Sequence, residues 1–294
     1  MSELHIACSA DENYAPHSAA LIHSALAHND CLLIHYLHGP SFASADAGRL
    51  ARMPKRPGQQ IVFHEIPDEW IAGLRIEDMF GPAMWYRIFL PELLGDVERV
   101  LYLDVDTLIL GGLDSLWELD LGASLLAAVR NVFMPHHRHR PVDLGIRPSD
   151  YFNSGVLLLN LERMRDDRFT EAILSLGRER SRHLEWPDQD ALNLAAEGRW
   201  LPLHPRWNVM NSMVMYPELA RAALGQAELD EALAAPAIRH FEGPGFNKPW
   251  HARHQRRGRR LYGSHRRATP WPRYSLDADN RWGKVKRLGA LFRG

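Results

Sequence analysis

Two carboxylates separated by a single residue follow an apolar stretch in the first half of the chain. Residues 100–103 have the apolar character of a buried strand, and Asp104 and Asp106 come directly after them. Residues two apart on an extended backbone point the same way, so both carboxylates can face one cation. Oxygen ligands of this kind suit Mg²⁺ or Mn²⁺. Taken alone, the pair is equally consistent with aspartates that form a turn at a strand end.

A second group of residues that could bind a metal or a phosphate begins at His240. The His240 imidazole could complete a metal site begun by two carboxylates. Gly243 and Gly245 allow the backbone to approach a phosphate closely, and Lys248 supplies a point charge for a diphosphate. A lone histidine is more often structural than a ligand. Here a histidine, two glycines and a lysine fall within nine residues, which favours a binding site.

Polar residues also follow the first expected strand, at residues 4–8. Asp11 could accept a hydrogen bond from the N3–H of a uracil ring, Asn13 could bond a polar edge of the base, and Tyr14 could stack on it. By itself this signal is weak, because Asp and Asn after a strand usually form a turn and a helix cap.

The elements that position these residues alternate between strands and helices. Further strands are expected at residues 31–37, 60–66, 124–129 and 156–161, and helices at residues 15–28, 113–119 and 188–197. This alternation predicts an α/β fold with a mainly parallel sheet covered on both faces, in which ligands bind beyond the carboxyl ends of the strands. Residues 131–150 lack periodicity, and we expect a solvated polar loop, since its histidines are spaced too tightly for a zinc site.

The composition is that of an intracellular globular protein. The 294 residues are 46% apolar and 24% charged, and no run of 18 uncharged apolar residues predicts a membrane-spanning helix. The N-terminus lacks the basic start and apolar stretch of a secretory signal. Two cysteines and the absence of an Asn-x-Ser/Thr acceptor favour a reducing compartment, and we expect a cytoplasmic protein.

The charge is distributed unevenly along the chain. Residues 251–294 carry 13 Lys and Arg against 2 Asp and Glu, whereas the other 250 residues carry 22 basic and 34 acidic groups. Interleaved aromatic residues at Trp271, Tyr274 and Trp282 favour peripheral contact of this basic tail with an anionic membrane over nonspecific nucleic-acid binding. A specific nucleic-acid partner is not expected.

Five blocks of the chain, taken together and in this order, resemble family 8 of the retaining glycosyltransferases, above all its bacterial lipooligosaccharide galactosyltransferases. They are Ala10-Asp11-Glu12-Asn13-Tyr14, Leu103-Asp104-Val105-Asp106, Phe152-Asn153-Ser154-Gly155-Val156, Asp188-Gln189-Asp190 with Asn193, and His240 to His251. The resemblance covers about residues 4–251. It implies a single GT-A-type nucleotide-sugar-binding domain with a Rossmann-like sheet over residues 1–250, followed by the tail.

The resemblance also implies the reaction. The donor would be UDP-galactose or UDP-glucose, the acceptor a saccharide or glycolipid, and the setting the assembly of cell-surface polysaccharide or lipopolysaccharide. Residues 131–150 do not match the family closely, and in the family this region helps to bind the acceptor. The identity of the acceptor is therefore left open.

Roles for individual residues follow from the same blocks. Asp104, Asp106 and His240 would ligate Mn²⁺, with Mg²⁺ as the alternative. The uridine would be held by Asp11, Asn13 and Tyr14. The diphosphate would contact Gly245 and Lys248, and the transferred sugar would contact Asn153, Asp188 and Gln189.

Three of these roles compete with plain structural ones. Arg87 matches a family arginine near the donor but could equally be a salt-bridged helix residue. Asn153 could belong only to a turn before the next strand, and Asp188 could cap a helix. Gln189 stands at the family's candidate nucleophile position, and an amide is a poor nucleophile. We therefore favour attack on the same face as departure, with Gln189 positioning or stabilising the sugar and Asp188 holding its hydroxyls.

Other functions compete with the transferase. Asp104 to Thr107 also fits the Asp-x-Asp-x-Thr signature of aspartyl-phosphate phosphatases, with Asp104 as nucleophile, but that signature follows a first strand and here about a hundred residues precede it. A nucleotide-sugar-binding protein without turnover and a self-glycosylating primer are the remaining alternatives.

Overall fold

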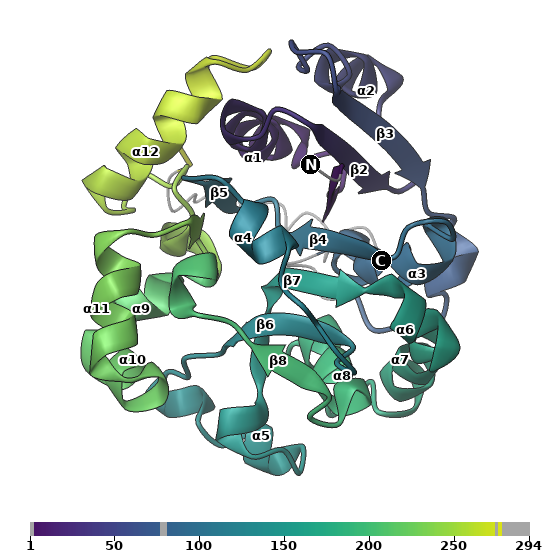
Figure 1. Ribbon diagram of the computed structural model, residues 1–294, viewed down its shortest axis with the longest axis vertical. Coiled ribbons are helices and arrows are strands. Elements are labelled where there is room, and N and C mark those ends of the chain that lie inside the picture. The colour runs from purple at the N-terminus through teal and green to yellow at the C-terminus, as the bar shows by residue number, and fades with distance from the viewer. Residues whose placement is uncertain (1–2, 77–80, 274–275, 278–294) are drawn as a thin grey trace, which may run out of the picture.

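A seven-stranded sheet forms the centre of the protein in the computed structural model, which describes residues 3–76, 81–273 and 276–277 (Figure 1). Its strand order is β3-β2-β1-β4-β7-β6-β8. Six of these strands run in one direction and β7 runs against them, which confirms the predicted mainly parallel sheet. The strands are β1 (Leu4–Ser9), β2 (Leu32–His38), β3 (Gln59–Glu65), β4 (Arg99–Leu103), β6 (Leu126–Arg130), β7 (Phe152–Asn160) and β8 (Trp200–Pro202).

Helices cover both faces of the sheet and bury two apolar cores. One core packs β1, β2 and β4 against α1, α4 and the segment that contains α9 to α11. The other packs the opposite face against η2 (Pro82–Phe89), α3 and α6 to α8. The helices are α1 (Ala15–His28), α2 (Ser44–Leu50), α3 (Leu90–Leu93), α4 (Asp114–Trp117), α5 (Arg140–Asp143), α6 (Leu161–Asp166), α7 (Phe169–Glu179), α8 (Pro187–Ala196), α9 (Asn211–Met215), α10 (Pro217–Leu224), α11 (Gln226–Ala234) and α12 (Arg256–Arg267).

Strand β7 begins earlier than the apolar pattern indicates. Its first residues include Asn153, Ser154 and Gly155, which are buried, so the alternative of a simple turn at this place is wrong. Val156 pairs with Leu103 at the end of β4, and the backbone N–H of Asp104 donates to Gly155 O at 2.8 Å. Polar residues of β7 therefore extend past the end of β4, beside the Asp104 carboxylate.

A second, two-stranded sheet joins β5 (Thr107–Ile109) to β9 (Ile238–His240). Thr107 pairs with His240 in an antiparallel register. This pairing, which the sequence pattern did not predict, brings the histidine within reach of the two aspartates from more than 130 residues away.

Residues 131–150 are more ordered than the expected polar loop. They form η3 (Pro135–His137), α5 and η4 (Pro148–Asp150). The buried Arg140 anchors them, because its Nε donates to Asp190 Oδ2 at 3.0 Å. The expectation of a wholly solvated loop is therefore wrong, since a buried ion pair holds this segment against α8.

Part of the basic segment after residue 250 is a helix packed on the body. In α12, Tyr262 is buried against α1 and its hydroxyl lies 2.6 Å from His17 Nδ1. Tyr274 and Trp282, together with the basic and apolar residues from 284 to 292, lie outside the described residues. Across the described ranges, none of the helices is both long and apolar enough to cross a membrane.

Candidate active site

A cleft of about 680 Å³ opens where β1 and β4 end. It lies where parallel sheets of this kind bind ligands. Of the residues singled out from the sequence, only Asn13 does not line it; its backbone N–H instead donates to Asp11 Oδ1 at 2.9 Å. The cleft brings together Asp11, Tyr14, Arg87, Asp104, Asp106, Asn153, Asp188, Gln189, His240, Gly245 and Lys248.

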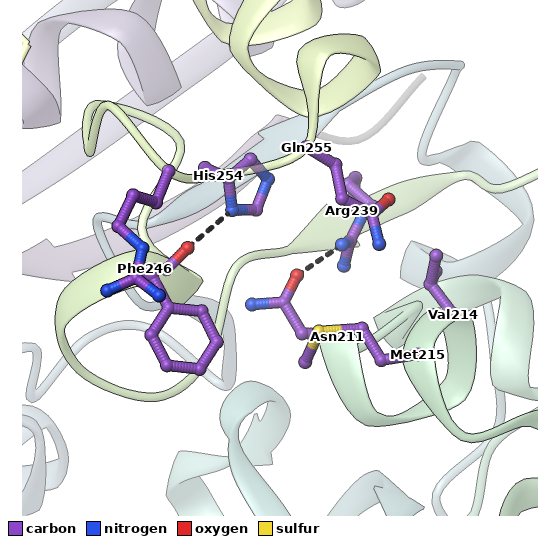
Figure 2. Close-up of a pocket in the computed structure, with 8 residues that line it drawn as sticks. Asn211, Val214, Met215, Arg239, Phe246, His254 and Gln255 are labelled. Carbon is purple, nitrogen blue, oxygen red and sulfur yellow. Dashed lines mark hydrogen bonds between the residues drawn. The ribbon is translucent and has the colours of Figure 1, made fainter.

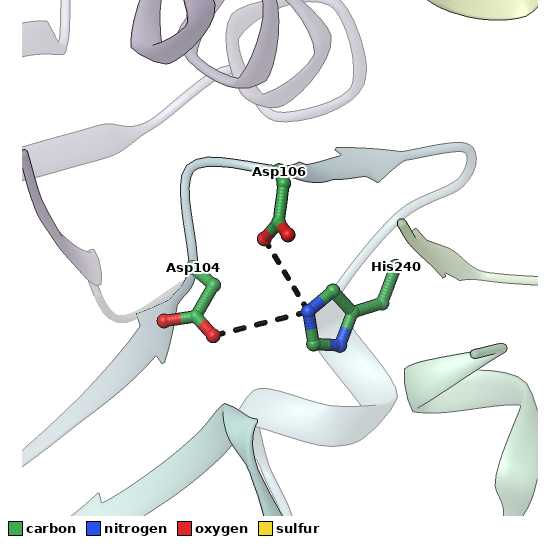
Figure 3. A group of neighbouring side chains, drawn as sticks. All are labelled: Asp104, Asp106 and His240. Carbon is green, nitrogen blue, oxygen red and sulfur yellow. Dashed lines mark ion pairs between the residues drawn. The ribbon is translucent and has the colours of Figure 1, made fainter. Parts of the chain in front are cut away.

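Asp104, Asp106 and His240 converge in this cleft (Figure 3). His240 Nε2 lies 3.3 Å from Asp106 Oδ1 and 3.8 Å from Asp104 Oδ2. One ligand atom from each residue falls within 4.8 Å of the others, and among the described residues this is the one such group of three. The β5–β9 pairing and the i, i+2 spacing of the aspartates together produce this arrangement.

The second oxygen of each carboxylate is already engaged. Asp104 Oδ1 accepts from Arg87 Nη2 at 2.8 Å and from the Tyr102 hydroxyl at 3.1 Å. Asp106 Oδ2 contacts the ammonium of Lys248. The remaining oxygens and His240 Nε2 are thus left facing one another, which is the donor set that fits a divalent cation.

Neighbouring cationic groups keep the Asp106 carboxylate charged. Burial alone would raise the pKa of Asp106, but the ammonium of Lys248 and the imidazole of His240 outweigh it, and the pKa lies well below its ordinary value. Burial alone would lower the pKa of His240, but Asp106 and Asp104 outweigh it and the pKa is raised. The Asp106 carboxylate is therefore held in its ionised form, which is the form in which a carboxylate binds a metal.

The absence of a side chain at Gly155 makes room for His240. A methyl group at this position would lie 2.2 Å from His240 Cε1 and 2.8 Å from Asp104 Oδ2. The sequence block around Asn153 therefore contributes to the metal-type site through its glycine, a role that its residue types alone did not indicate.

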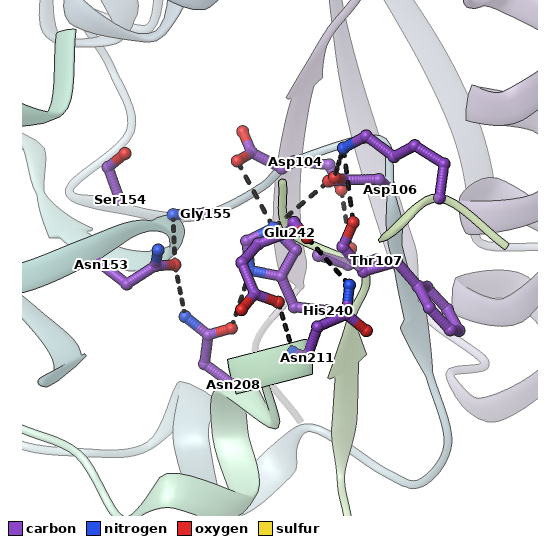
Figure 4. Close-up of polar contacts among 12 residues, drawn as sticks. Asp104, Asp106, Thr107, Asn153, Ser154, Gly155, Asn208, Asn211, His240 and Glu242 are labelled. Carbon is purple, nitrogen blue, oxygen red and sulfur yellow. Dashed lines mark hydrogen bonds and ion pairs between the residues drawn. The ribbon is translucent and has the colours of Figure 1, made fainter. Parts of the chain in front are cut away.

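His240 is oriented from behind by Asn208, at the end of η5 (Pro205–Asn208) (Figure 4). Its Nδ1 lies 3.0 Å from Asn208 Oδ1, and Asn208 Nδ2 donates to Asn153 Oδ1 at 2.8 Å. Asn208 is fully buried. Nothing around Asn208 in the sequence resembles a motif, so this residue could not be singled out from the sequence.

Arg87 links Asp104 to Asp188 across the cleft. It lies on η2 (Pro82–Phe89), is buried, and donates from Nη1 to Ser154 O at 2.6 Å. Its Nη2 also lies 3.3 Å from Asp188 Oδ2. Arg87 is therefore a salt-bridged helical residue, and it also lines the cleft; its role near a donor stays a prediction.

Helix α8 presents neighbouring residues to different surroundings. Asp188 lines the cleft, and burial raises its pKa to about 6 although Arg87 opposes the shift. Asp190 has no exposed surface; it accepts from Arg140 and, at 2.5 Å, from the Tyr151 hydroxyl. The backbone N–H groups before the helix donate to Asp190 rather than to Asp188, so Asp188 is not the cap.

Gln189 turns its carboxamide oxygen toward β7. Gln189 Oε1 accepts from the backbone N–H of Ser154 at 2.9 Å, from the Ser154 hydroxyl at 3.3 Å and from Asn153 Nδ2 at 3.2 Å. Its Nε2 donates to the Tyr151 hydroxyl at 3.2 Å. An oxygen that accepts three hydrogen bonds is a still weaker nucleophile than a free amide, because its lone pairs are engaged.

The turn after β1 forms one end of the cleft. Asp11 Oδ1 accepts from the backbone N–H of Asn13 and of Tyr14, which leaves Oδ2 free of the turn. Tyr14 packs edge-on against Trp250 with 6.0 Å between ring centroids. An aromatic face and a carboxylate oxygen therefore border this end.

The opposite wall carries residues that the sequence did not single out. Glu242 accepts from the backbone N–H of Ser212 at 2.8 Å, and the Ser212 hydroxyl is buried without a hydrogen-bond partner. A smaller hollow of about 40 Å³ adjoins this wall (Figure 2). It shares with the cleft Asn211, Met215 and the exposed Phe246.

Comparison with known proteins agrees with this geometry. The sequence profile of glycosyl transferase family 8 matches residues 5–254. General stress protein A of Bacillus subtilis is 29% identical over 275 residues, which cover 91% of this chain and 94% of that protein. The lipopolysaccharide 1,2-glucosyltransferase of Escherichia coli is 28% identical over 214 residues, 70% of this chain and 62% of its own length.

A solved structure shows the same architecture. The galactosyltransferase LgtC, crystallised with donor and acceptor sugar analogues, is 27% identical and superimposes with a TM-score of 0.78 over 89% of this chain and 96% of its own. The mostly parallel sheet is the GT-A fold of that enzyme. With the family match spanning most of the chain and the cleft described above, the chain belongs to glycosyl transferase family 8.

Proposed function

We propose that the chain is a metal-dependent retaining hexosyltransferase that takes galactose or glucose from a UDP-sugar and passes it to a saccharide or glycolipid acceptor. The observation that carries the proposal is the convergence of Asp104 Oδ2, Asp106 Oδ1 and His240 Nε2 in a cleft that also holds the Asp188–Gln189 pair. Two carboxylate oxygens and one imidazole nitrogen fit Mn²⁺, with Mg²⁺ as the alternative.

The two ends of the cleft suit the two parts of the donor. Asp11 Oδ2 and the ring of Tyr14 would grip the uracil, while the turn that Asn13 completes would hold them in place. The cation, when bound, would neutralise charge on the diphosphate. Lys248 would add its ammonium to the same group, and the backbone at Gly245, which has a φ of 60°, would approach it closely.

The sugar would lie between Asn153, Asp188 and Gln189. Asp188, pulled toward Arg87, would accept hydrogen bonds from sugar hydroxyls. The engagement of Gln189 Oε1 by Ser154 and Asn153 argues against a covalent intermediate on this residue. Asp190 is enclosed by Arg140 and Tyr151 and is not available to the sugar. These contacts support same-face attack, with Gln189 positioning the ring.

A relative and the basic C-terminal segment support the proposed setting of the reaction. Similarity to the lipopolysaccharide 1,2-glucosyltransferase of Escherichia coli supports a role in the assembly of cell-surface polysaccharide. The exposed arginines of α12 (Arg256, Arg257 and Arg260) support peripheral contact of residues 251–294 with an anionic membrane at its cytoplasmic face. Flotation with vesicles that contain phosphatidylglycerol, compared with neutral vesicles, tests this contact. Equal recovery with both would contradict it.

The central test is release of UDP from a panel of UDP-sugars, with Mn²⁺ or with EDTA, in the presence of a saccharide and glycolipid pool. We expect release from one donor that requires the metal and is lost in Asp104→Asn, but not in Asp96→Asn, which changes an exposed carboxylate. NMR of the product should show the donor's anomeric configuration. Tight binding of a UDP-sugar without release, whatever the acceptor, would instead support the non-catalytic binding protein.

A further inference from the structure

A single chain of hydrogen bonds connects the metal-type triad to the buried end of α8. Its first bonds run from His240 Nδ1 to Asn208 Oδ1 (3.0 Å) and from Asn208 Nδ2 to Asn153 Oδ1 (2.8 Å). It continues from Asn153 Nδ2 to Gln189 Oε1 and ends at a carboxylate. In order, the members are His240, Asn208, Asn153, Gln189, Tyr151 and Asp190.

Two backbone N–H groups of β7 fix the direction of this chain. Gly155 N donates to the Asn153 side chain at 3.1 Å, and Ser154 N donates to the Gln189 side chain at 2.9 Å. A backbone N–H can only donate, so the atoms that it meets must be the carboxamide oxygens. The orientation of both amides is therefore set by the strand, and it does not depend on how amide atoms are assigned.

The tautomer of His240 follows from this direction. Because Asn153 presents its oxygen to Asn208, Asn208 must present its nitrogen in return and turn its own oxygen toward the imidazole. His240 Nδ1 then carries the hydrogen, and in the neutral ring Nε2 keeps its lone pair facing Asp104 and Asp106. A ligating histidine needs this form.

We propose that Asn208 is a positioning residue that couples the metal triad to the sugar-binding amides. Its oxygen holds His240 in the ligating tautomer, and its nitrogen holds Asn153, and through it Gln189, in the orientation that both amides have where they line the cleft. Asn208 is fully buried and makes one hydrogen bond to each side, so the two functions can be removed separately. The metal and sugar roles in this inference rest on the proposed function.

Two substitutions at Asn208 distinguish its hydrogen bond to His240 from its hydrogen bond to Asn153. Asn208→Asp keeps an acceptor for His240 Nδ1 but has no hydrogen to donate to Asn153. Asn208→Leu has a similar shape and makes neither bond. Asn29→Leu is the matched control, because Asn29 is also buried and hydrogen-bonded, to Ala25 O, but lies in the α1–β2 connection away from the cleft.

The first measurement needs neither metal nor turnover. ¹⁵N NMR of metal-free protein labelled on histidine, at a pH above the pKa of His240, reports which ring nitrogen carries the hydrogen, and loss of the signal in His240→Gln assigns it. We expect Nδ1–H in the wild type and in Asn208→Asp, and a shift toward Nε2–H in Asn208→Leu.

The second measurement is Mn²⁺ affinity in the presence of UDP, together with kcat. We expect Asn208→Leu to lose about 10- to 100-fold in affinity, as removal of a partner behind a ligating histidine does. Asn208→Asp should bind Mn²⁺ within about threefold of wild type yet lose at least about tenfold in kcat, with rates compared at saturating metal. Asn29→Leu should leave both unchanged after correction for folding.

The outcomes separate this inference from the proposed function. Nδ1–H and full Mn²⁺ affinity in Asn208→Leu, or full kcat in Asn208→Asp, would overturn the coupling. If Asn208→Leu does not fold, Asn208→Asp still decides through its kcat and its NMR signal. Failure of the wild type to bind Mn²⁺ with UDP would instead refute the proposed metal site, while the tautomer of His240 would still be measured independently.

Discussion

Replacing Gly155 with alanine should disable the metal-type site with little other effect on the fold. The added methyl would lie 2.2 Å from His240 Cε1, whereas carbon atoms in contact prefer at least about 3.5 Å, so the ring must retreat by about 1.3 Å. His240 cannot do so and keep its bond to Asn208. A misplacement of this size near a reacting centre costs about 100-fold in rate, and overpacking costs about 1–3 kcal/mol in free energy of unfolding.

The assay compares Mn²⁺ affinity, UDP release and thermal melting of Gly155→Ala with those of Gly111→Ala. Gly111 has no atom within 4 Å of an added methyl and no left-handed backbone angle, so its replacement should be neutral. Because a loss of about 100-fold in UDP release far exceeds what partial unfolding of a stable protein causes, the two effects can be told apart. Metal affinity and turnover within about threefold of wild type in Gly155→Ala would refute the placement of His240 against β7.

Three further predictions concern neighbouring residues. Asp188→Asn should lose at least about tenfold in kcat with little change in melting temperature. Asp190→Asn should instead lose about 3–5 kcal/mol in free energy of unfolding, because it breaks a buried ion pair with Arg140. The reverse pattern would contradict the assignment of the two aspartates. Arg87→Lys should lose at least about tenfold in turnover, since one ammonium cannot reach Ser154 O and both carboxylates; full activity would contradict it. Burial lowers the pKa of His17 to about 3 from 6.5. The unfolded chain therefore binds a proton that the folded chain excludes, and the free energy of unfolding should fall as pH falls from about 6.5 toward 3, by up to about 1.4 kcal/mol per pH unit. Denaturant titrations should show a shallower fall in His17→Phe, and an identical slope would contradict the assignment.

Much of the fold could be predicted because the signals are local. Buried parallel strands appear as short apolar runs, and the strands at residues 4–9 and 32–38 were found within one residue of their ends. The aspartate pair could be placed at the sheet edge because it directly follows such a run. The direction of β7 could not be predicted, since an apolar strand looks the same in either orientation and only its partners decide.

Other parts of the site depend on contacts that leave no pattern in the chain. The β5–β9 pairing joins two segments of three residues each, which is too short for a periodic signal. Asn208 and Glu242 each make two side-chain hydrogen bonds to residues of distant segments. Arg140 is buried because it forms an ion pair with Asp190, fifty residues away. The composition around Arg140 gives no sign of this distant partner and is typical of an exposed loop.

The helical period explains why α8 can anchor the fold and line the cleft at once. Successive residues of a helix are rotated by about 100°, so Asp188 and Asp190 point in widely different directions although they are two apart. One reaches the cleft and Arg87, and the other is enclosed by Arg140 and Tyr151. Gln189 lies between them and binds β7 on the same side as Asn193, one turn later, whose Nδ2 donates to Phe152 O. The enclosed carboxylate of Asp190 accepts hydrogen bonds at the start of α8 and fixes it, and this fixed start holds Asp188 and Gln189 in place where they line the cleft.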